Sequence, residues 1–186
     1  MNVVEKYTYL DTSALMRRAE LLGSEPLERS VQIGSVLNRV FADPSRKFGC
    51  SELTLLEFHS NVTTLLRSPS EQFGQVWWDR ALAELMADLA SGKIVVLEAP
   101  PKAAEHVMSL VTVATGTLGR ALKAWDAMHA VVAAKWAEDS GQAVTILTSD
   151  ADFGVALEVM VGFGQLEIEN LDVLASTGHG ADRRSA

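Results

Sequence analysis

The sequence predicts a single α/β domain in which a central parallel sheet of about four or five short strands is flanked by helices. Two observations lead to this prediction. Short apolar runs alternate along the chain with amphipathic helical patterns, which is typical of parallel strands joined by helices. The chain of 186 residues, 48% of them hydrophobic, is long enough for one well-packed core and too short for two comfortable ones.

In the first half of the chain, apolar spacing defines one strand and four helices. The run YTYL predicts a strand, because it is short, aromatic and followed at once by an acid. The segments after it carry apolar side chains every three or four positions, which is helical spacing. The predicted strand is 7–10, and the predicted helices are 12–22, 31–41, 51–67 and 72–91.

In the second half, strands and helices alternate regularly. Gly92 precedes an apolar run, Pro100 and Pro101 suit the first turn of a helix, the loop TGTLG breaks that helix, and Gly141 ends the next one. The predicted strands are 93–97, 143–147 and 166–169, and the predicted helices are 100–114, 120–140 and 152–160. The domain is expected to span residues 1–175, and the tail 176–186, which has lost apolar periodicity, is predicted to be disordered.

Composition excludes several classes of protein. The single Cys50 rules out an internal disulfide and, with four histidines, leaves no plausible zinc cluster. The N-terminus is not that of a signal peptide and no apolar run of membrane-spanning length occurs, so we expect a cytoplasmic protein with no membrane partner. The net charge of −8 argues against a general nucleic-acid binder. A weak basic surface remains in the first quarter of the chain, from Arg17, Arg18, Arg29, Arg39, Arg46 and Lys47.

Two acids follow predicted strands. Asp11 ends YTYLD and precedes Thr12 and Ser13, and Asp150 ends VTILTSD after Thr148. In parallel sheets ligands bind beyond the carboxyl ends of the strands, where both acids are expected. The structural alternative is helix capping, since short oxygen side chains accept hydrogen bonds from the N–H groups of a first turn. Asp150, or Asp152 two residues on, could cap the next helix in this way.

Two further acids lie on predicted helices. Asp126 is placed on or beside an inward face with Leu122, His129 and Ala130, where an ionised carboxylate needs a cation or strong donors. Its structural alternative is pairing with a buried arginine or with backbone N–H groups. Glu57 flanks the apolar stripe of LTLLEFHSNV, and its alternative is a solvated helix edge.

If these four carboxylates converge, they need a cation. Two unit charges about 4 Å apart repel by roughly 4 kcal/mol at an effective dielectric of 20. Oxygen ligands without cysteine or histidine favour Mg²⁺ or Mn²⁺ over zinc. Such ions, with positions open to water and phosphate, suit phosphodiester hydrolysis.

Four segments resemble the PIN-domain nucleases, and among them the VapC-type toxins of toxin-antitoxin pairs: YLDTSAL, SELTLLEFHSNV, AWDAMHAVVAA and ILTSDADF. The resemblance implies a Mg²⁺-dependent (or Mn²⁺-dependent) endoribonuclease that acts on RNA, forms a homodimer and is inhibited by an antitoxin protein. It also implies that an acidic metal site contains the four acids, with polar companions and one auxiliary acid. These residues are Asp11, Glu57, Asp126 and Asp150, then Thr12, Ser13 and Thr148, and finally Asp152.

The aromatic and histidine residues are mostly expected to be structural. The tryptophans could stack on RNA bases, but Trp125 and Trp136 share a helix face and are predicted to pack in the core. His129 is predicted to be a buried, hydrogen-bonded histidine. The helix 72–91 carries a wide apolar stripe, for which core packing is favoured and a dimer or antitoxin surface stays open. The stripe consists of Trp77, Trp78, Ala81, Leu82, Leu85, Met86 and Leu89.

Other functions remain as alternatives. A phosphatase with an aspartate nucleophile would want a second acid two residues after Asp11, where the sequence has Ser13. A non-catalytic binding module with the same fold is the alternative outside enzymes, since a fold alone does not establish activity. A housekeeping nuclease is the alternative to a toxin.

Overall fold

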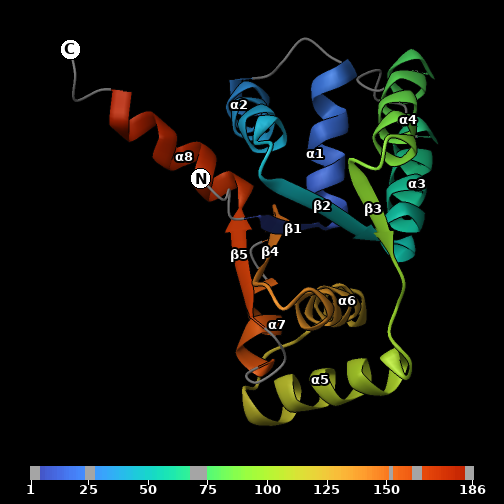
Figure 1. Ribbon diagram of the computed structural model, residues 1–186, viewed down its shortest axis with the longest axis vertical. Coiled ribbons are helices and arrows are strands. Elements are labelled where there is room, and N and C mark those ends of the chain that lie inside the picture. Colours follow the sequence, from blue (N-terminus) through green and yellow to red (C-terminus); the bar gives the residue numbers. More distant parts are fainter. Residues whose placement is uncertain (1–4, 24–27, 68–74, 151–152, 161–164, 183–186) are drawn as a thin grey trace.

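Five parallel strands form one sheet in the computed structural model, which describes residues 5–23, 28–67, 75–150, 153–160 and 165–182 (Figure 1). The strand order is β3-β2-β1-β4-β5, with every neighbouring pair parallel. The strands are β1 (Lys6–Leu10), β2 (Arg46–Ser51), β3 (Ile94–Leu97), β4 (Val144–Thr148) and β5 (Leu166–Asn170). The predicted fold class is confirmed.

Helices cover both faces of the sheet, as Figure 1 shows. One face is covered by α1 (Thr12–Gly23), α2 (Glu28–Ala42), α3 (Glu52–Arg67) and α4 (Gln75–Ala90), with α8 (Leu171–Asp182) packed against α2. The other face is covered by α5 (Ala103–Thr117), α6 (Ala124–Ser140) and α7 (Gly154–Val159). A central strand is therefore buried on both sides, and β1 places Tyr9 in one core layer and Leu10 in the other.

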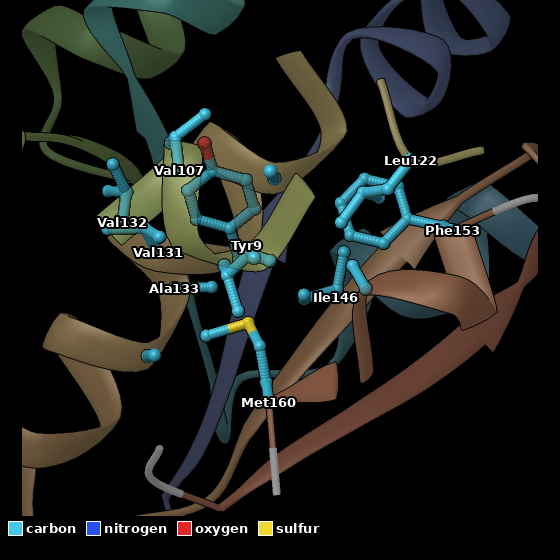
Figure 2. Packing of buried hydrophobic residues seen from close by; sticks show 14 of the residues in the cluster. Tyr9, Val107, Leu122, Val131, Val132, Ala133, Ile146, Phe153 and Met160 are labelled. Carbon is cyan, nitrogen blue, oxygen red and sulfur yellow. The ribbon is translucent and has the colours of Figure 1, made fainter. Parts of the chain in front are cut away.

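Figure 2 shows the core layer between the sheet and helices α5 to α7, where Tyr9 and Ile146 pack with Val132 and Ala133 of α6. Five alanines of α6 are almost completely buried, and such small side chains allow a helix to approach a sheet closely: Ala127, Ala130, Ala133, Ala134 and Ala137. This approach brings the first turn of α6 next to the ends of the central strands.

The chain leaves β1 and β4 toward opposite faces. After β1 it enters α1 on one face, and after β4 it enters α7 on the other. Neighbouring strands whose connections diverge leave a crevice between their carboxyl ends, which is the ligand-binding position in open α/β sheets. Asp11 follows β1 directly, and Asp150 lies two residues after the end of β4.

Three predictions about elements were wrong. The strand β2 was missed, and it occupies an inner position between β1 and β3. Helix α5 continues through most of the TGTLG segment to Thr117. Residues 176–182 of the predicted disordered tail belong to α8, which Leu171 and Ala175 anchor to the core.

In the described ranges, no helix is both long enough and apolar enough to cross a membrane.

Candidate active site

A pocket of about 580 Å³ lies at the crevice between β1 and β4, and all four predicted acids line it. We call it the acidic pocket. It is lined by Asp11, Thr12, Ser13, Met16, Arg17, Glu57, Asn61, Lys123, Trp125, Asp126, His129, Ser149 and Asp150. The acids come from the end of β1, from α3, from the first turn of α6 and from the turn after β4. Asp152 lies outside the described residues.

Asp11 is held rigidly at the floor of the acidic pocket. Only 4% of it is exposed. Its Oδ1 accepts hydrogen bonds from the backbone N–H of Ala14 and from Ser13 Oγ, both at 2.8 Å, and its Oδ2 accepts one from Thr148 Oγ1 at 2.7 Å. The capping interpretation is therefore correct, since the bond to Ala14 caps α1, yet the same carboxylate lines the pocket. Burial raises the pKa of Asp11, although these hydrogen bonds and His129 oppose the rise.

The turn after β4 is tied to the turn after β1. Ser13 Oγ accepts a hydrogen bond from the backbone N–H of Ser149 at 2.6 Å, and Thr148 Oγ1 accepts one from the N–H of Asp150 at 2.9 Å. The hydroxyls of Ser13 and Thr148 thus connect the two strand ends and set the position of Asp150 relative to Asp11.

Glu57 is half-buried rather than solvated, so its helix-edge interpretation is wrong. Its Oε2 accepts hydrogen bonds from Thr12 Oγ1 at 2.5 Å and from His129 Nε2 at 2.8 Å. Burial raises the pKa of Glu57, but the hydrogen bonds from His129 and Thr12 outweigh it and the net pKa is lowered.

His129 is buried and hydrogen-bonded, as predicted, with 3% of it exposed. Its Nδ1 lies 2.8 Å from the Tyr9 hydroxyl, and the same hydroxyl lies 2.9 Å from Ser51 Oγ. Because a hydroxyl has one proton, Tyr9 donates to only one of these two groups at a time. Because an ionised Glu57 can only accept, Nε2 of His129 carries a proton. A chain of buried polar groups therefore runs from the sheet through His129 to Glu57, and it fixes that carboxylate.

The negative charge of Asp150 acts on the carboxyl group of Asp126. Burial raises the pKa of Asp126, and the charges of Asp150 and Asp11 raise it further, while Lys123 and His129 oppose them. The Lys123 ammonium lies 3.5 Å from Asp150 Oδ2. No arginine pairs with Asp126 among the described residues, so its structural alternative of a buried arginine partner is wrong. The charge of Lys123, on the pocket wall, therefore acts on both acids.

The donor atoms of the acidic pocket suit a hard cation in kind, because they are carboxylate and hydroxyl oxygens. The repulsion among Asp126, Asp150 and Asp11 is what such an ion would relieve. In the part of the chain that the structure describes, however, no three carboxylate, imidazole or thiol side chains stand close enough together to hold a metal ion. The metal site stays a prediction.

Comparison with known proteins gives remote likenesses. No family model and no curated protein matches the chain. DNA-bound VapBC from Salmonella typhimurium is similar over 90% of this chain and 99% of that chain, with 18% identity and a TM-score of 0.49. VapBC2 from Rickettsia felis, bound to a DNA fragment from its promoter, is similar over 87% and 98%, with 13% identity and a TM-score of 0.49.

Both solved structures are of VapBC. At a TM-score of 0.49 the likeness is too distant to assign function.

Seven residues that line the acidic pocket were not predicted as site residues: Met16, Arg17, Asn61, Lys123, Trp125, His129 and Ser149. Helical spacing could have found two of them, since Arg17 follows Ser13 and Asn61 follows Glu57 by four positions, one turn further along the same face. Trp125 was predicted to be in the core, which is wrong, because 58% of it is exposed. Trp136 does pack against the core, as predicted.

The stripe of α4 is only partly core. Ala81 and Leu85 are buried, as predicted, whereas Leu82 and Met86 are exposed, so core packing was the wrong prediction for this part of the stripe. The side chain of Trp77 lies outside the described part of the structure.

Proposed function

We propose that this chain is a metal-dependent endoribonuclease that hydrolyses RNA phosphodiester bonds and serves as the toxin of a toxin-antitoxin pair. The observation that carries the proposal is the meeting of Asp11, Glu57, Asp126 and Asp150, from four separate elements, in one pocket at the carboxyl edge of a parallel sheet. An antitoxin partner and a homodimer are part of the proposal, and they follow from the resemblance of the four motifs.

The metal-binding roles are proposed from the resemblance of the four motifs, and the role of Glu57 from its hydrogen bonds. Asp11, Asp126 and Asp150 would hold Mg²⁺ or Mn²⁺, with Asp152 as an auxiliary acid. When bound, such an ion supplies Lewis-acid activation of water and offsets negative charge on the phosphate. Glu57 has a lowered pKa and two fixed donors, so it is ionised at neutral pH and can orient the attacking water. Ser13, Thr12 and Thr148 keep the carboxylates in place.

Cleavage of a structured RNA by the purified protein tests the proposal. Cleavage should require Mg²⁺ or Mn²⁺ and stop on addition of EDTA. Asp11→Asn and Asp126→Asn should each lower the cleavage rate by at least about 100-fold, since even outer-shell substitutions at metal sites cost 10- to 100-fold. Glu138→Gln, an exposed acid on the same helix as Asp126, is the matched control and should cleave like the parent.

Circular dichroism separates lost chemistry from lost folding in these variants. Parent-level cleavage by a folded Asp11→Asn or Asp126→Asn protein would show that the assignment is wrong. Toxin status needs a separate measurement: expression should arrest growth, a neighbouring antitoxin gene should rescue it, and Asp11→Asn should be harmless. A harmless parent would favour a housekeeping nuclease.

One observation favours a non-catalytic binding module as the second candidate. Within the described residues, no three acids are close enough to share an ion. This alternative predicts no turnover with any divalent metal, together with retained binding of RNA.

The phosphatase alternative is disfavoured by the structure. Both oxygens of Asp11 already accept hydrogen bonds, and only 4% of the residue is exposed, so the carboxylate is poorly placed to attack phosphorus. Small phosphomonoesters should therefore not be hydrolysed.

A further inference from the structure

Trp125 lies on the wall of the acidic pocket, immediately before Asp126 in the first turn of α6. With 58% of its area exposed, it leaves much of a large apolar ring in water. Tryptophan is enriched at binding surfaces, because its ring supplies a large apolar area together with a polar N–H group. The chain thus keeps an aromatic surface beside the carboxylates that are proposed to act on RNA.

Two cationic side chains line the same pocket. Lys123 lies at the N-terminal end of α6, and its side chain is 63% exposed. Arg17 lies on α1, far from Lys123 in the sequence, and lines the same pocket. Lys123 also lies 3.5 Å from Asp150 Oδ2, so its charge is shared with an acid of the pocket. The pocket therefore combines an exposed indole with cations, although the whole chain is acidic.

This combination is characteristic of sites for single-stranded nucleic acid. Cations track the phosphates, and aromatic side chains stack on bases whatever their identity. Stacking needs an exposed base face, which a loop, a bulge or a single strand offers and a continuous duplex does not. A volume of about 580 Å³ is also within the range of pockets that hold small organic groups.

We propose that Trp125 stacks on an unpaired base of the RNA next to the scissile phosphodiester, and that Lys123 contacts a phosphate oxygen of the same strand. The inference rests on the proposed function and adds a requirement for an unpaired nucleotide at the acidic pocket. Trp125 is then a specificity-determining residue, distinct from the acids that carry the chemistry.

Binding without turnover tests this inference separately from the proposed function. A 5′-fluorescein-labelled single-stranded RNA is titrated with the full chain in EDTA, and the same sequence is titrated as a duplex. The parent should bind the single strand more tightly than the duplex. Trp125→Ala should weaken single-strand binding about tenfold, within the range expected for one stacked base, and Trp125→Phe should retain most of the affinity.

Met108→Ala is the matched control, because Met108 is also an exposed apolar residue (70%) but lies on α5, outside the pocket. It should bind RNA like the parent. Lys123→Gln should weaken binding to all sequences and reduce the salt dependence by about one counterion. With Mg²⁺ present, Trp125→Ala should raise KM and leave kcat within about twofold, a split that a merely structural role would not give.

Each outcome decides one point. Equal binding by Trp125→Ala and the parent, or equal parental affinity for single strand and duplex, overturns the inference and leaves Trp125 to a protein partner. Absence of any RNA binding overturns it as well. Binding that depends on Trp125, in a protein that cleaves no RNA with any metal, supports the inference and refutes the proposed nuclease.

Discussion

The two ends of helix α6 carry the same residue in opposite environments. Trp125, at the start, is 58% exposed on the wall of the acidic pocket. Trp136, near the end, packs edge-on to Tyr7, with ring centroids 5.2 Å apart, and lies directly over Gly49 of β2. At about 100° per residue the eleven positions between them bring both rings to nearly the same side of the helix. Helical periodicity alone therefore predicts the same burial for both.

The two tryptophans differ in burial because the sheet extends beneath only one end of the helix. Trp136 lies above strands, whereas the first turn of α6 reaches the crevice beyond the carboxyl ends of β1 and β4, where the acids gather. One face of a helix can therefore pack in the core at one end and line a pocket at the other.

The largest expected effect is a difference in stability between the two tryptophans. Trp136→Ala should lower the free energy of unfolding by about 3 kcal/mol, the low end for a buried tryptophan, since part of the ring is exposed. Trp125→Ala should change it by no more than about 0.5 kcal/mol, as expected of an exposed side chain. Urea unfolding of both variants measures the difference, and equal losses would contradict the proposed division of the helix.

Gly49→Ala should lower the free energy of unfolding, because Gly49 lies in the sheet directly beneath Trp136. A Cβ at this position would lie 2.9 Å from Leu97 Cδ1 and 2.9 Å from Trp136 Cζ3. Overpacking of this kind should cost about 2 kcal/mol, and Trp136→Phe in the same chain should recover part of it. Gly116→Ala, where no atom lies within 4 Å, is the control and should unfold no more easily than the parent. If the loss of stability caused by Gly49→Ala is unchanged when Trp136→Phe is also present, the contact with Leu97 or with the backbone is its cause.

Tyr9→Phe should cost about 1 to 2 kcal/mol, because it removes a buried hydroxyl that bonds to His129 Nδ1 at 2.8 Å and to Ser51 Oγ at 2.9 Å. Tyr7→Phe is the matched control in the same strand, since the Tyr7 hydroxyl bonds only weakly, at 3.2 Å, to the exposed Glu5. Thermal unfolding of both proteins measures the contrast. Equal stability of the two variants would mean that the chain of polar groups from Tyr9 to Glu57 does not hold the middle of α6.

The smallest effect should be a gain in stability at the pocket end. The pKa of Asp126 is raised, mainly by burial, so the folded state binds this proton more tightly than the unfolded state does. Its contribution to stability is complete below the unfolded pKa, about 3.8, and is lost as the pH rises through the folded pKa. At pH 7 the charge therefore opposes folding, and Asp126→Asn should stabilise the protein by about 1 kcal/mol or less, because solvent screens a half-exposed group.

The gain from Asp126→Asn should disappear near pH 3.8 in urea unfolding curves recorded across the pH range. Asp79→Asn, an exposed acid on α4, is the control. A variant that is less stable than the parent at pH 7 would mean that the Asp126 carboxylate is compensated within the fold. A more stable and inactive Asp126→Asn protein would instead be typical of a residue kept for function.

Much of the architecture could be predicted from local pattern. Alternating apolar runs and helical stripes predicted the parallel sheet and most helices, because the spacing of apolar residues is imposed by the geometry of each element. The acids after β1 and β4 were predicted to meet because carboxyl ends of parallel strands lie at the same edge. His129 was predicted to be buried because it lies on an apolar face.

Other features were decided only by the tertiary structure. The segment RKFGCS becomes the strand β2 through its pairing with β1 and β3 on either side, although it has few residues of high strand propensity. The hydrogen bonds that fix Glu57 come from residues 45 positions earlier and 72 positions later, which no local spacing reveals. The exposure of Trp125 depends on where the sheet ends beneath α6. The sequence by itself determined which faces are apolar and which strands end in acids, because these depend on neighbouring residues, whereas burial at the pocket depends on surfaces brought together from distant parts of the chain.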